Sequence, residues 1–325
     1  MPIIENPVIA LAPNKHKVLS VYRQQLKKLS KSAADKESIL KAEKKLHDLG
    51  FVDWVKNLSK EDQEMLKNNE IQNYIAWRIA WKLSSVSSPC RPVFDASQPT
   101  DTGKSLNDVL VKGRNNMNKL QEVFMRWAMH RVAYHCDLQT WYNSVDLRKE
   151  DWCYQRYLWE ETLNPENPPQ EKIIKTIIYG IKPSGNLVQR AMLDTAAISK
   201  EKFPEAFEVI SRDLYADDCM SGEQNLSLAQ QRADELEIVL SVGGFTVKGF
   251  TFSGQKPSVK LSEDGKCIYV AGMKYYPETD QLAFAFGDVN FSKKSRGRKP
   301  SVNQLTWLPE TPLHNMVHVM WALLL

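Results

Sequence analysis

The sequence predicts an α+β fold in which an antiparallel sheet is backed by helices. Short apolar or alternating runs typical of strands occur between longer segments with helical spacing, and no segment repeats along the chain. The 325 residues, 42% hydrophobic and 25% charged, suffice for one large domain or two ordinary ones. A net charge of +4 permits an acidic partner such as nucleic acid without requiring one.

A charged helical region is predicted at the start of the chain, over residues 1–72. Apolar residues recur at helical spacing from Val18 to Leu29 and again from Ile39 to Leu49, and Gly50 is placed to end the second helix. This region also carries a short basic run, which is more typical of a solvated helix face than of a nucleic-acid contact. The run consists of Lys27, Lys28 and Lys31.

Strand-like and helix-like segments then alternate. The segments with strand character are 74–95, 132–136, 154–159, 172–179, 245–252 and 267–286. The segments with helical character are 115–130, 183–199, 204–212 and 226–242. This mixture, with turn signals between neighbouring strands, favours antiparallel pairing.

The cysteines and the two ends of the chain indicate a reducing, intracellular environment. Five cysteines are scattered without a C-x-x-C pair, which disfavours a disulfide framework or a zinc site. The start lacks the basic and apolar regions of a signal peptide, and the apolar end, 316–325, is too short to span a bilayer. We therefore expect a soluble protein with no membrane partner.

Two adjacent carboxylates, Asp217 and Asp218, mark the most informative stretch. They follow Tyr215 and Ala216 between apolar segments, which predicts a hairpin with both carboxylates at its tip. Hard oxygen ligands in such a position suit divalent cations such as Mg²⁺. An ordinary Asp-rich turn would have the same sequence.

A third carboxylate, Asp137, follows an apolar strand eighty residues before Asp217. One carboxylate at a strand end and two at a hairpin tip can hold two Mg²⁺ (or Mn²⁺) ions for an in-line displacement at phosphorus. Buried carboxylates this close repel one another unless cations neutralise them. A purely structural alternative is that Asp137 caps the helix that follows it.

Two further motifs predict little. Asp101-Thr102-Gly103 is the tripeptide of aspartic proteases, but it lies in a polar loop instead of following an apolar strand. The sequence Gly103-Lys104-Ser105 matches the end of a phosphate-binding P-loop, G-x-x-x-x-G-K-S, but Gln98 stands at the position of the first glycine. Neither motif has the local context that its chemistry requires.

Seven motifs occur in order between about Tyr74 and Phe286. They are CRPVFDAS at 90–97, SLND at 105–108, DLQTWYNSV at 137–145, YGIKPS at 179–184 with Gln189, YADD at 215–218, GGFTVK at 243–248 and YVAGMKYYP at 269–277. Together they resemble the reverse transcriptase of BEL/Pao-type LTR retrotransposons, as a fragment of a pol polyprotein. The resemblance covers roughly two thirds of the chain.

The resemblance implies a right-hand polymerase fold. Fingers and palm would occupy 73–288, with an antiparallel palm sheet, and 289–325 would be a basic linker and a truncated tail from a shortened or frameshifted element. The activity would be two-metal transfer of a nucleotide from a dNTP to the 3′-hydroxyl of a DNA primer on an RNA template. The protein would work in the cytoplasm, within a retroelement particle, or in the nucleus.

The resemblance also implies roles for individual residues. Asp137, Asp217 and Asp218 would be the catalytic metal ligands. The remaining roles would be nucleotide binding by Arg91, Tyr142, Gly180, Ser184 and Lys248 and nucleic-acid binding by Tyr215, Gly272 and Met273. Arg91 would contact the triphosphate and Tyr142 would exclude a ribose 2′-hydroxyl, whereas Lys248 would protonate pyrophosphate.

Two alternatives accompany this interpretation. The same fold could be a catalytically inactive relic that binds nucleic acid or partner chains, because a fold does not guarantee an activity. A polymerase that copies DNA could also use the same carboxylates. The presence of all three carboxylates argues against inactivation by point mutation, and the short C-terminal end argues for inactivation by truncation.

Overall fold

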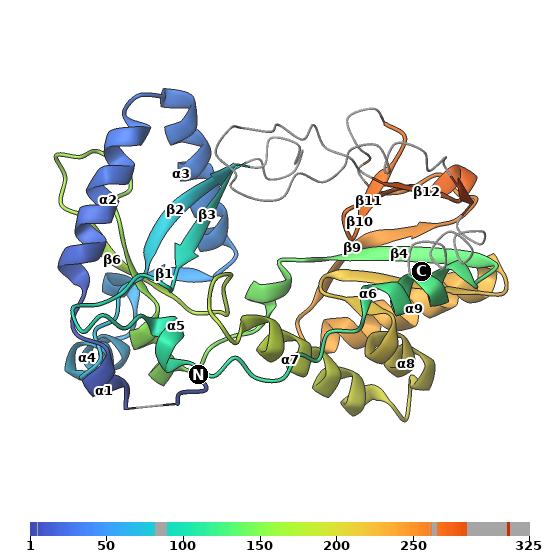
Figure 1. The fold of residues 1–325 in the computed structure, drawn as a ribbon, viewed down its shortest axis with the longest axis horizontal. Helices are drawn as coiled ribbons and strands as arrows, with labels where there is room; N and C mark the ends of the chain where they lie inside the picture. The colour runs from blue at the N-terminus through green and yellow to red at the C-terminus, as the bar shows by residue number, and fades with distance from the viewer. Residues whose placement is uncertain (5, 82–89, 260, 262–264, 285–310, 313–325) are drawn as a thin grey trace, which may run out of the picture. The chain divides into compact units, whose positions relative to one another are not determined.

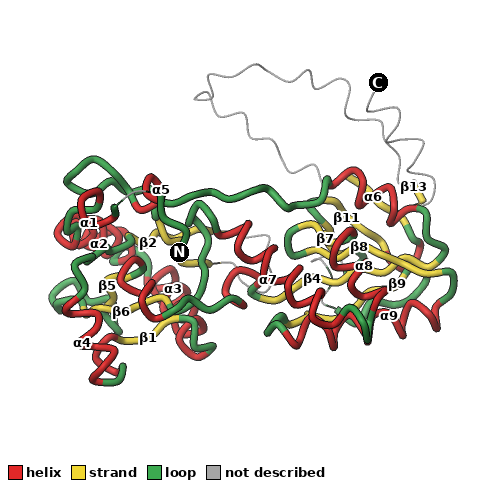
Figure 2. Tube along the Cα trace, turned by 90° about the horizontal axis from the view of Figure 1, so that it is seen from below, coloured by secondary structure: helices red, strands yellow, loops and turns green. Residues whose placement is uncertain are grey.

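The computed structural model describes residues 1–4, 6–81, 90–259, 261, 265–284 and 311–312. The chain forms two compact units, each of which combines helices with antiparallel strands (Figures 1 and 2). The first unit contains Met1–Asn116 and Thr140–Ala191, and the second contains Met117–Gln139 and Met192–Leu325. The α+β class predicted from the sequence is confirmed.

The helices of the first unit are α1 (Pro7–Ala10), α2 (Lys15–Leu29), α3 (Ala33–Asp48), α4 (Lys60–Asn68) and α5 (Leu106–Val109), together with the start of α7 (Ser184–Ser199). Of these, α2 and α3 form where the apolar spacing predicts helices. In α2 the buried side chains recur every three or four residues, from Val18 to Leu29. Ser32 caps α3 by accepting a hydrogen bond from the Asp35 amide, and Gly50 follows the helix with φ of 76°.

The strands of the first unit form a three-stranded sheet and a separate hairpin. The sheet has the order β1 (Val52–Trp54), β6 (Gln170–Ile174), β5 (Arg156–Trp159), and the hairpin pairs β2 (Ala76–Trp81) with β3 (Cys90–Asp95). Both pack into one apolar core, where the rings of Trp77 and Trp159 lie 5.0 Å apart. The short helices η1 (Val55–Asn57), η2 (Trp141–Ser144) and η3 (Lys149–Tyr154) connect these elements.

A four-stranded antiparallel sheet is the centre of the second unit. Its order is β7 (Leu214–Tyr215), β8 (Asp218–Glu223), β4 (Val132–Gln139), β9 (Thr246–Phe252). The helices α6 (Leu120–Ala128), α8 (Pro204–Arg212) and α9 (Leu226–Val242) pack against it (Figure 1). The prediction of a sheet backed by helices is therefore met in this unit.

A second small sheet completes the unit and shares its apolar core. It contains β10 (Ile268–Val270), β11 (Met273–Tyr276), β12 (Gln281–Phe284) and β13 (Thr311–Pro312), with η4 (Pro277–Thr279) between β11 and β12. Trp127 of α6 lies between the two sheets, with its ring centroid 4.8 Å from that of Tyr275 and 6.5 Å from that of His135. This packing fixes β10 and β11 near the β4–β8 pair.

Several predicted boundaries differ from the observed ones. The helix expected over 115–130 begins at Leu120, and residues 111–119 before it have no regular structure. The strand expected over 172–179 begins at Gln170 and ends at Ile174, and Leu49 is 43% exposed instead of buried. The predicted basic linker and nearly all of the tail lie outside the described residues.

The compact units also divide the chain elsewhere than at residues 72 and 288. Residues 1–72 belong to the first unit, and α7 (Ser184–Ser199) runs from the first unit into the second. Within the described part of the chain, no helix combines the length and the apolar character needed to cross a bilayer.

Candidate functional site

The second unit brings the three predicted carboxylates to one end of its central sheet. Asp137 of β4 is directly opposite Asp218 of β8 in the antiparallel register. The Leu138 amide donates to the Asp217 carbonyl over 2.8 Å, which holds the β7–β8 turn against β4. The predicted hairpin is therefore present, with Asp217 in its two-residue turn and Asp218 opening the return strand.

The backbone around these carboxylates is strained. Ala216, in the turn, has φ of 56°, and Ala271, in the turn between β10 and β11, has φ of 45°. Non-glycine residues in this region cost of order 1–3 kcal/mol each and persist only where the surrounding structure holds them. Such strain is more frequent at functional sites than elsewhere, which makes this end of the sheet a candidate site.

Asp137 lies at a β-bulge that directs Lys248 toward it. Between Cys136 and Leu138 the register with β9 shifts, so that Lys248 and Gly249 both lie opposite Asp137. Gly249 has φ of 128°, a value that side-chain-bearing residues rarely adopt. Lys248 Nζ consequently reaches both carboxylate oxygens of Asp137 at 2.8 Å. Asp137 does not cap a helix, because the residue preceding η2 is Thr140 and makes no side-chain cap.

Both oxygens of Asp218 are also engaged, one by a buried side chain and the other by the amide of a half-buried residue. His135 Nε2 lies 2.8 Å from Oδ1, and the Ala271 amide donates to Oδ2 over 2.9 Å. The side chains of His135 and Asp218 are only 5% and 15% exposed. Asp218 is thus held by the sheet on one side and by the β10–β11 turn on the other.

Asp217 differs from the other two carboxylates. It is half-buried, and no ion pair with it is found among the described residues. Burial, followed by the negative charges of Asp218 and Asp137, raises the pKa of Asp217 to about 6. Lys248 and the Asp217 amide oppose that rise only in part. A proton on Asp217 relieves this repulsion, and a bound cation would do the same.

The donor set fits a hard divalent cation, although its side chains do not form a ready ligand set. Three carboxylates supply oxygen ligands, the kind that Mg²⁺ and Mn²⁺ prefer. In the part of the chain that the structure describes, however, no three His, Cys, Asp or Glu side chains are arranged to hold a metal ion. Lys248 forms an ion pair with Asp137, and an exposed pair of this kind contributes at most about 1 kcal/mol to stability. A divalent cation could displace it at little cost.

Three residues predicted to bind nucleic acid lie close to the carboxylates in the fold. Tyr215 pairs with Asp218 across the β7–β8 hairpin. Gly272, with φ of 87°, follows Ala271 in the β10–β11 turn, and Met273 begins β11. The side chains of Tyr215 and Met273 are half-buried against the apolar core below the site. These two side chains therefore contribute to the packing of the core, whether or not they also contact nucleic acid.

The first unit brings together three other predicted motifs: CRPVFDAS, SLND and the turn of YGIKPS that contains Gly180. Gly180 has φ of 89°, and a Cβ there would lie 2.5 Å from the Phe94 carbonyl oxygen. Asn107 donates to the Gly180 carbonyl and accepts from the Lys182 amide, both over 2.8 Å. Ser184 is buried and donates to the Ile178 carbonyl over 2.6 Å. These motifs therefore form one closely packed turn.

Arg91 and Tyr142 are the other two residues of the first unit predicted to bind nucleotide. Arg91 is an exposed residue on β3 that forms no ion pair with another described residue. Tyr142 is half-buried in η2, and its ring centroid lies 4.5 Å from that of Tyr179. The predicted site residues thus fall into a set of four in the first unit and a set of seven in the second.

The two competing motifs have structural explanations. Asp101 forms an ion pair with Lys17 at 2.9 Å and lies 3.4 Å from His16. The loop that contains Gly103 is closed on itself by a hydrogen bond from the Thr100 amide to the Lys104 carbonyl. The Asp101 carboxylate is thus paired with α2, and the loop around Gly103 is closed by its own backbone.

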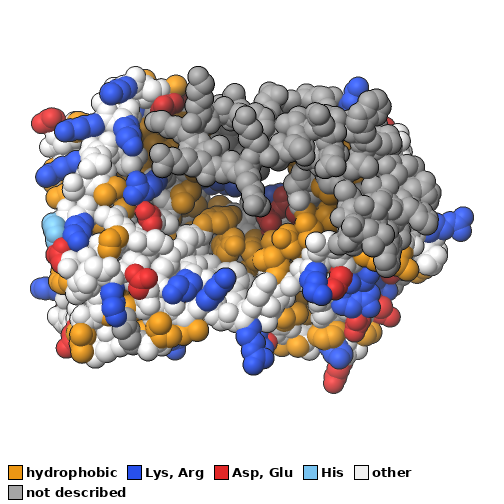
Figure 3. Space-filling model, in the orientation of Figure 1, with side chains coloured by type: hydrophobic (Ala, Val, Ile, Leu, Met, Phe, Trp, Pro, Cys, Tyr) orange, Lys and Arg blue, Asp and Glu red, His pale blue; other side chains and the backbone are white. Residues whose placement is uncertain are grey.

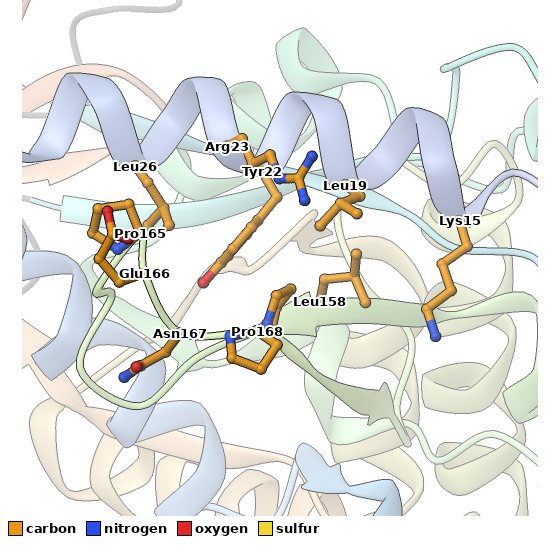
Figure 4. A pocket seen from close by; sticks show the side chains of 11 residues that line it. Lys15, Leu19, Tyr22, Arg23, Leu26, Leu158, Pro165, Glu166, Asn167 and Pro168 are labelled. Carbon is orange, nitrogen blue, oxygen red and sulfur yellow. The ribbon is translucent and has the colours of Figure 1, made fainter.

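A groove of about 360 Å³ lies elsewhere in the first unit, between α2 and the proline-rich loop at 165–169 (Figure 4). Tyr22 points toward that loop, and its buried hydroxyl has no hydrogen-bond partner among the residues that the structure describes. Lys and Arg side chains gather over the same helix (Figure 3). The residues that line the groove are Lys15, Leu19, Tyr22, Arg23, Leu26, Leu158 and 165–169. They include none of the predicted site residues.

Sequence reasoning missed His135 and underused Asn107. His135 stands two positions before Asp137, so on a strand both side chains point to the same face. That signal was available, but only the pairing of β4 with β8 shows that His135 reaches Asp218. Asn107 was noted within a motif, whereas its contacts to Gly180 and Lys182 depend on the tertiary fold.

No protein-family model matches the sequence, and no curated protein is significantly similar to it.

Proposed function

We propose that this protein is an RNA-directed DNA polymerase, with Asp137, Asp217 and Asp218 as its catalytic carboxylates. The observation that supports this most directly is the gathering of the three at one end of the β7–β8–β4–β9 sheet, where burial, followed by the charges of Asp218 and Asp137, raises the pKa of Asp217. Of the three, Asp217 has no ion pair among the described residues that would explain its position by folding alone. The order of motifs that resembles a BEL/Pao-type reverse transcriptase supplies the specific reaction.

In this proposal the second unit is the palm and provides the reaction centre. Divalent cations, Mg²⁺ or Mn²⁺, would supply the positive charge that activates a primer 3′-hydroxyl and stabilises the leaving pyrophosphate. Asp137, Asp217 and Asp218 would hold them. Lys248, released from Asp137, would become available as a proton donor to pyrophosphate.

The first unit would contain the fingers. Arg91, exposed and without an ion-pair partner among the described residues, could present its guanidinium to a triphosphate in bidentate fashion. Tyr142 would discriminate against a ribose 2′-hydroxyl, and the Gly180 turn with Ser184 would form the floor below the nucleotide. Template and primer would be held through backbone and shape, because a polymerase must accept every sequence.

A primer-extension assay tests the proposal. The purified chain is incubated with a DNA primer on an RNA template, dNTPs and Mg²⁺ or Mn²⁺, beside Asp217→Asn and Asp101→Asn. We expect extension by the native chain and by the Asp101 variant, and a loss of at least about 10³-fold for the Asp217 variant. Asp101 is a matched control because it is an exposed carboxylate that pairs only with α2. Extension that survives Asp217→Asn would overturn the assignment.

A second candidate is a non-catalytic protein that binds nucleic acid or partner chains through the same fold. The observation that favours it is the pairing of Lys248 with Asp137, which gives the site an internal cation. The same assay separates the two candidates. Absence of extension in every variant, with retention of salt-sensitive binding to an RNA–DNA duplex, would favour the non-catalytic protein.

A further inference from the structure

The three carboxylates of the candidate site are held in three different ways. Asp137 pairs with Lys248, whose side chain is 46% exposed, and Asp217 has no ion pair among the described residues. Asp218 alone is held through each oxygen by a different group, the buried His135 side chain and the amide of the half-buried Ala271. It is therefore the carboxylate whose orientation the fold determines most strictly.

His135 supplies one of the two contacts that fix Asp218. On β4, His135 and Asp137 point to the same face, and the register places His135 opposite Met220 and Asp137 opposite Asp218. His135 and Asp218 are therefore diagonal neighbours across the β4–β8 pair. The His135 ring is held in turn by Trp127, 6.5 Å away between centroids, whose indole donates to the Tyr134 carbonyl over 3.0 Å.

The hydrogen bond has a defined polarity. An ionised carboxylate only accepts, so the Nε2 of His135 must carry the proton, whether the ring is neutral or protonated. The Ala271 amide, also a donor, uses the other oxygen. Each oxygen of Asp218 has a second lone pair. These lone pairs remain available for a cation, and the two donors prevent the carboxylate from rotating away.

We propose that His135 is a positioning residue that orients Asp218 as a metal ligand. This role rests on the proposed polymerase function, but it concerns an interaction which the motifs do not contain. Residues that orient a ligand in this way typically contribute about 10–100-fold to metal affinity. Without His135, Asp218 would keep only the Ala271 amide, and its carboxylate would have to be ordered when the cation binds.

The test measures Mn²⁺ binding directly, by the loss of the electron paramagnetic resonance signal of free Mn²⁺ during titration with protein. His135→Leu removes the donor but still fills the space beside Trp127 with a side chain. His135→Gln retains an N–H donor. We expect Mn²⁺ to bind the leucine variant about 10–100-fold more weakly than the native chain, with part of the loss restored in the glutamine variant. Tyr134→Phe is the control, because it alters the neighbouring buried residue on the opposite face of β4.

Primer extension at a series of Mn²⁺ concentrations distinguishes the possible failures. If His135 positions Asp218, the leucine variant needs more Mn²⁺ for half-maximal rate, while its rate at saturating Mn²⁺ falls less. An unchanged Mn²⁺ affinity in both folded His135 variants, with a native chain that extends primers, overturns the role of His135 and leaves the polymerase intact. A native chain that neither binds Mn²⁺ nor extends a primer overturns the proposed function and this role with it.

Discussion

The predicted site residues of the two units differ in how far folding explains them. In the first unit, the Phe94 carbonyl leaves no room for a side chain at Gly180, and the Ser184 hydroxyl satisfies the Ile178 carbonyl. In the second unit, Asp217 is placed where burial and two like charges act against its ionisation. The first two residues stabilise the fold, whereas the third destabilises it.

This difference is informative about function. A residue that the backbone requires would be present whether or not the turn binds a nucleotide. A carboxylate held in an unfavourable electrostatic environment needs another explanation, and ligand binding is the usual one. Gly180→Ala in the first unit and Asp217→Asn in the second should therefore change stability in opposite directions, which makes the comparison testable.

The largest expected effect is that of Gly180→Ala. The new Cβ would lie 2.5 Å from a backbone oxygen, at a residue with φ of 89°, so both the contact and the conformation are unfavourable. We expect the free energy of unfolding to fall by about 2–4 kcal/mol, measured by urea denaturation. Gly103→Ala is the matched control, because φ is 82° there and the Cβ meets no atom within 4 Å. That variant should lose only about 1 kcal/mol, and equal losses would show that the Phe94 contact is unimportant.

Asp217→Asn should instead raise the free energy of unfolding. The pKa of Asp217, about 6 in the folded chain, exceeds the unfolded value of 3.8, so the folded state binds this proton more tightly. The stability due to that proton is complete below about pH 3.8 and is lost as the pH rises through about 6. The asparagine variant is free of this loss, and we expect it to be more stable by about 1–2 kcal/mol at pH 7.5.

Urea denaturation at pH 7.5 and at pH 4 measures the gain and its pH dependence. The difference between the variant and the native chain should shrink at the lower pH, where Asp217 is protonated in the native chain. Asp218→Asn is the contrasting variant: if its oxygen keeps the Ala271 amide, its amide nitrogen faces His135 Nε2, which must change tautomer to accept from it. It should lose about 1–2 kcal/mol. A loss of stability in both variants would remove the proposed contrast between these neighbours.

The sequence predicted the local elements better than their contacts. Helix α9 begins and ends where the apolar spacing and Gly243 indicate, and the Asp217–Asp218 hairpin forms as expected, because both follow from signals within a few residues. The predicted start of α6 was wrong, because no local signal distinguishes the irregular residues 111–119 from the helix that follows them. Periodicity identifies a strand, but it does not give the strand's neighbours.

The same limit applies to the candidate site. The three carboxylates were identified from residue type and local context, whereas their partners His135, Ala271 and Lys248 are brought to them by the strand register, the β10–β11 turn and the β-bulge opposite Asp137. Each partner lies at least fifty residues from its carboxylate. The sequence therefore indicated which groups could react, and the fold shows how they are held.

The smallest expected effect concerns the pKa of Asp217 in variants of its charged neighbours. Asp218→Asn and Asp137→Asn each remove a negative charge and should lower it, more strongly for Asp218, whose charge acts more strongly than that of Asp137. Lys248→Met removes a positive charge and should raise it. An NMR titration of the carboxyl carbons measures all three shifts. If the pKa of Asp217 is the same in all three variants, burial alone raises it. The case for a shared cation site would then lose its electrostatic basis.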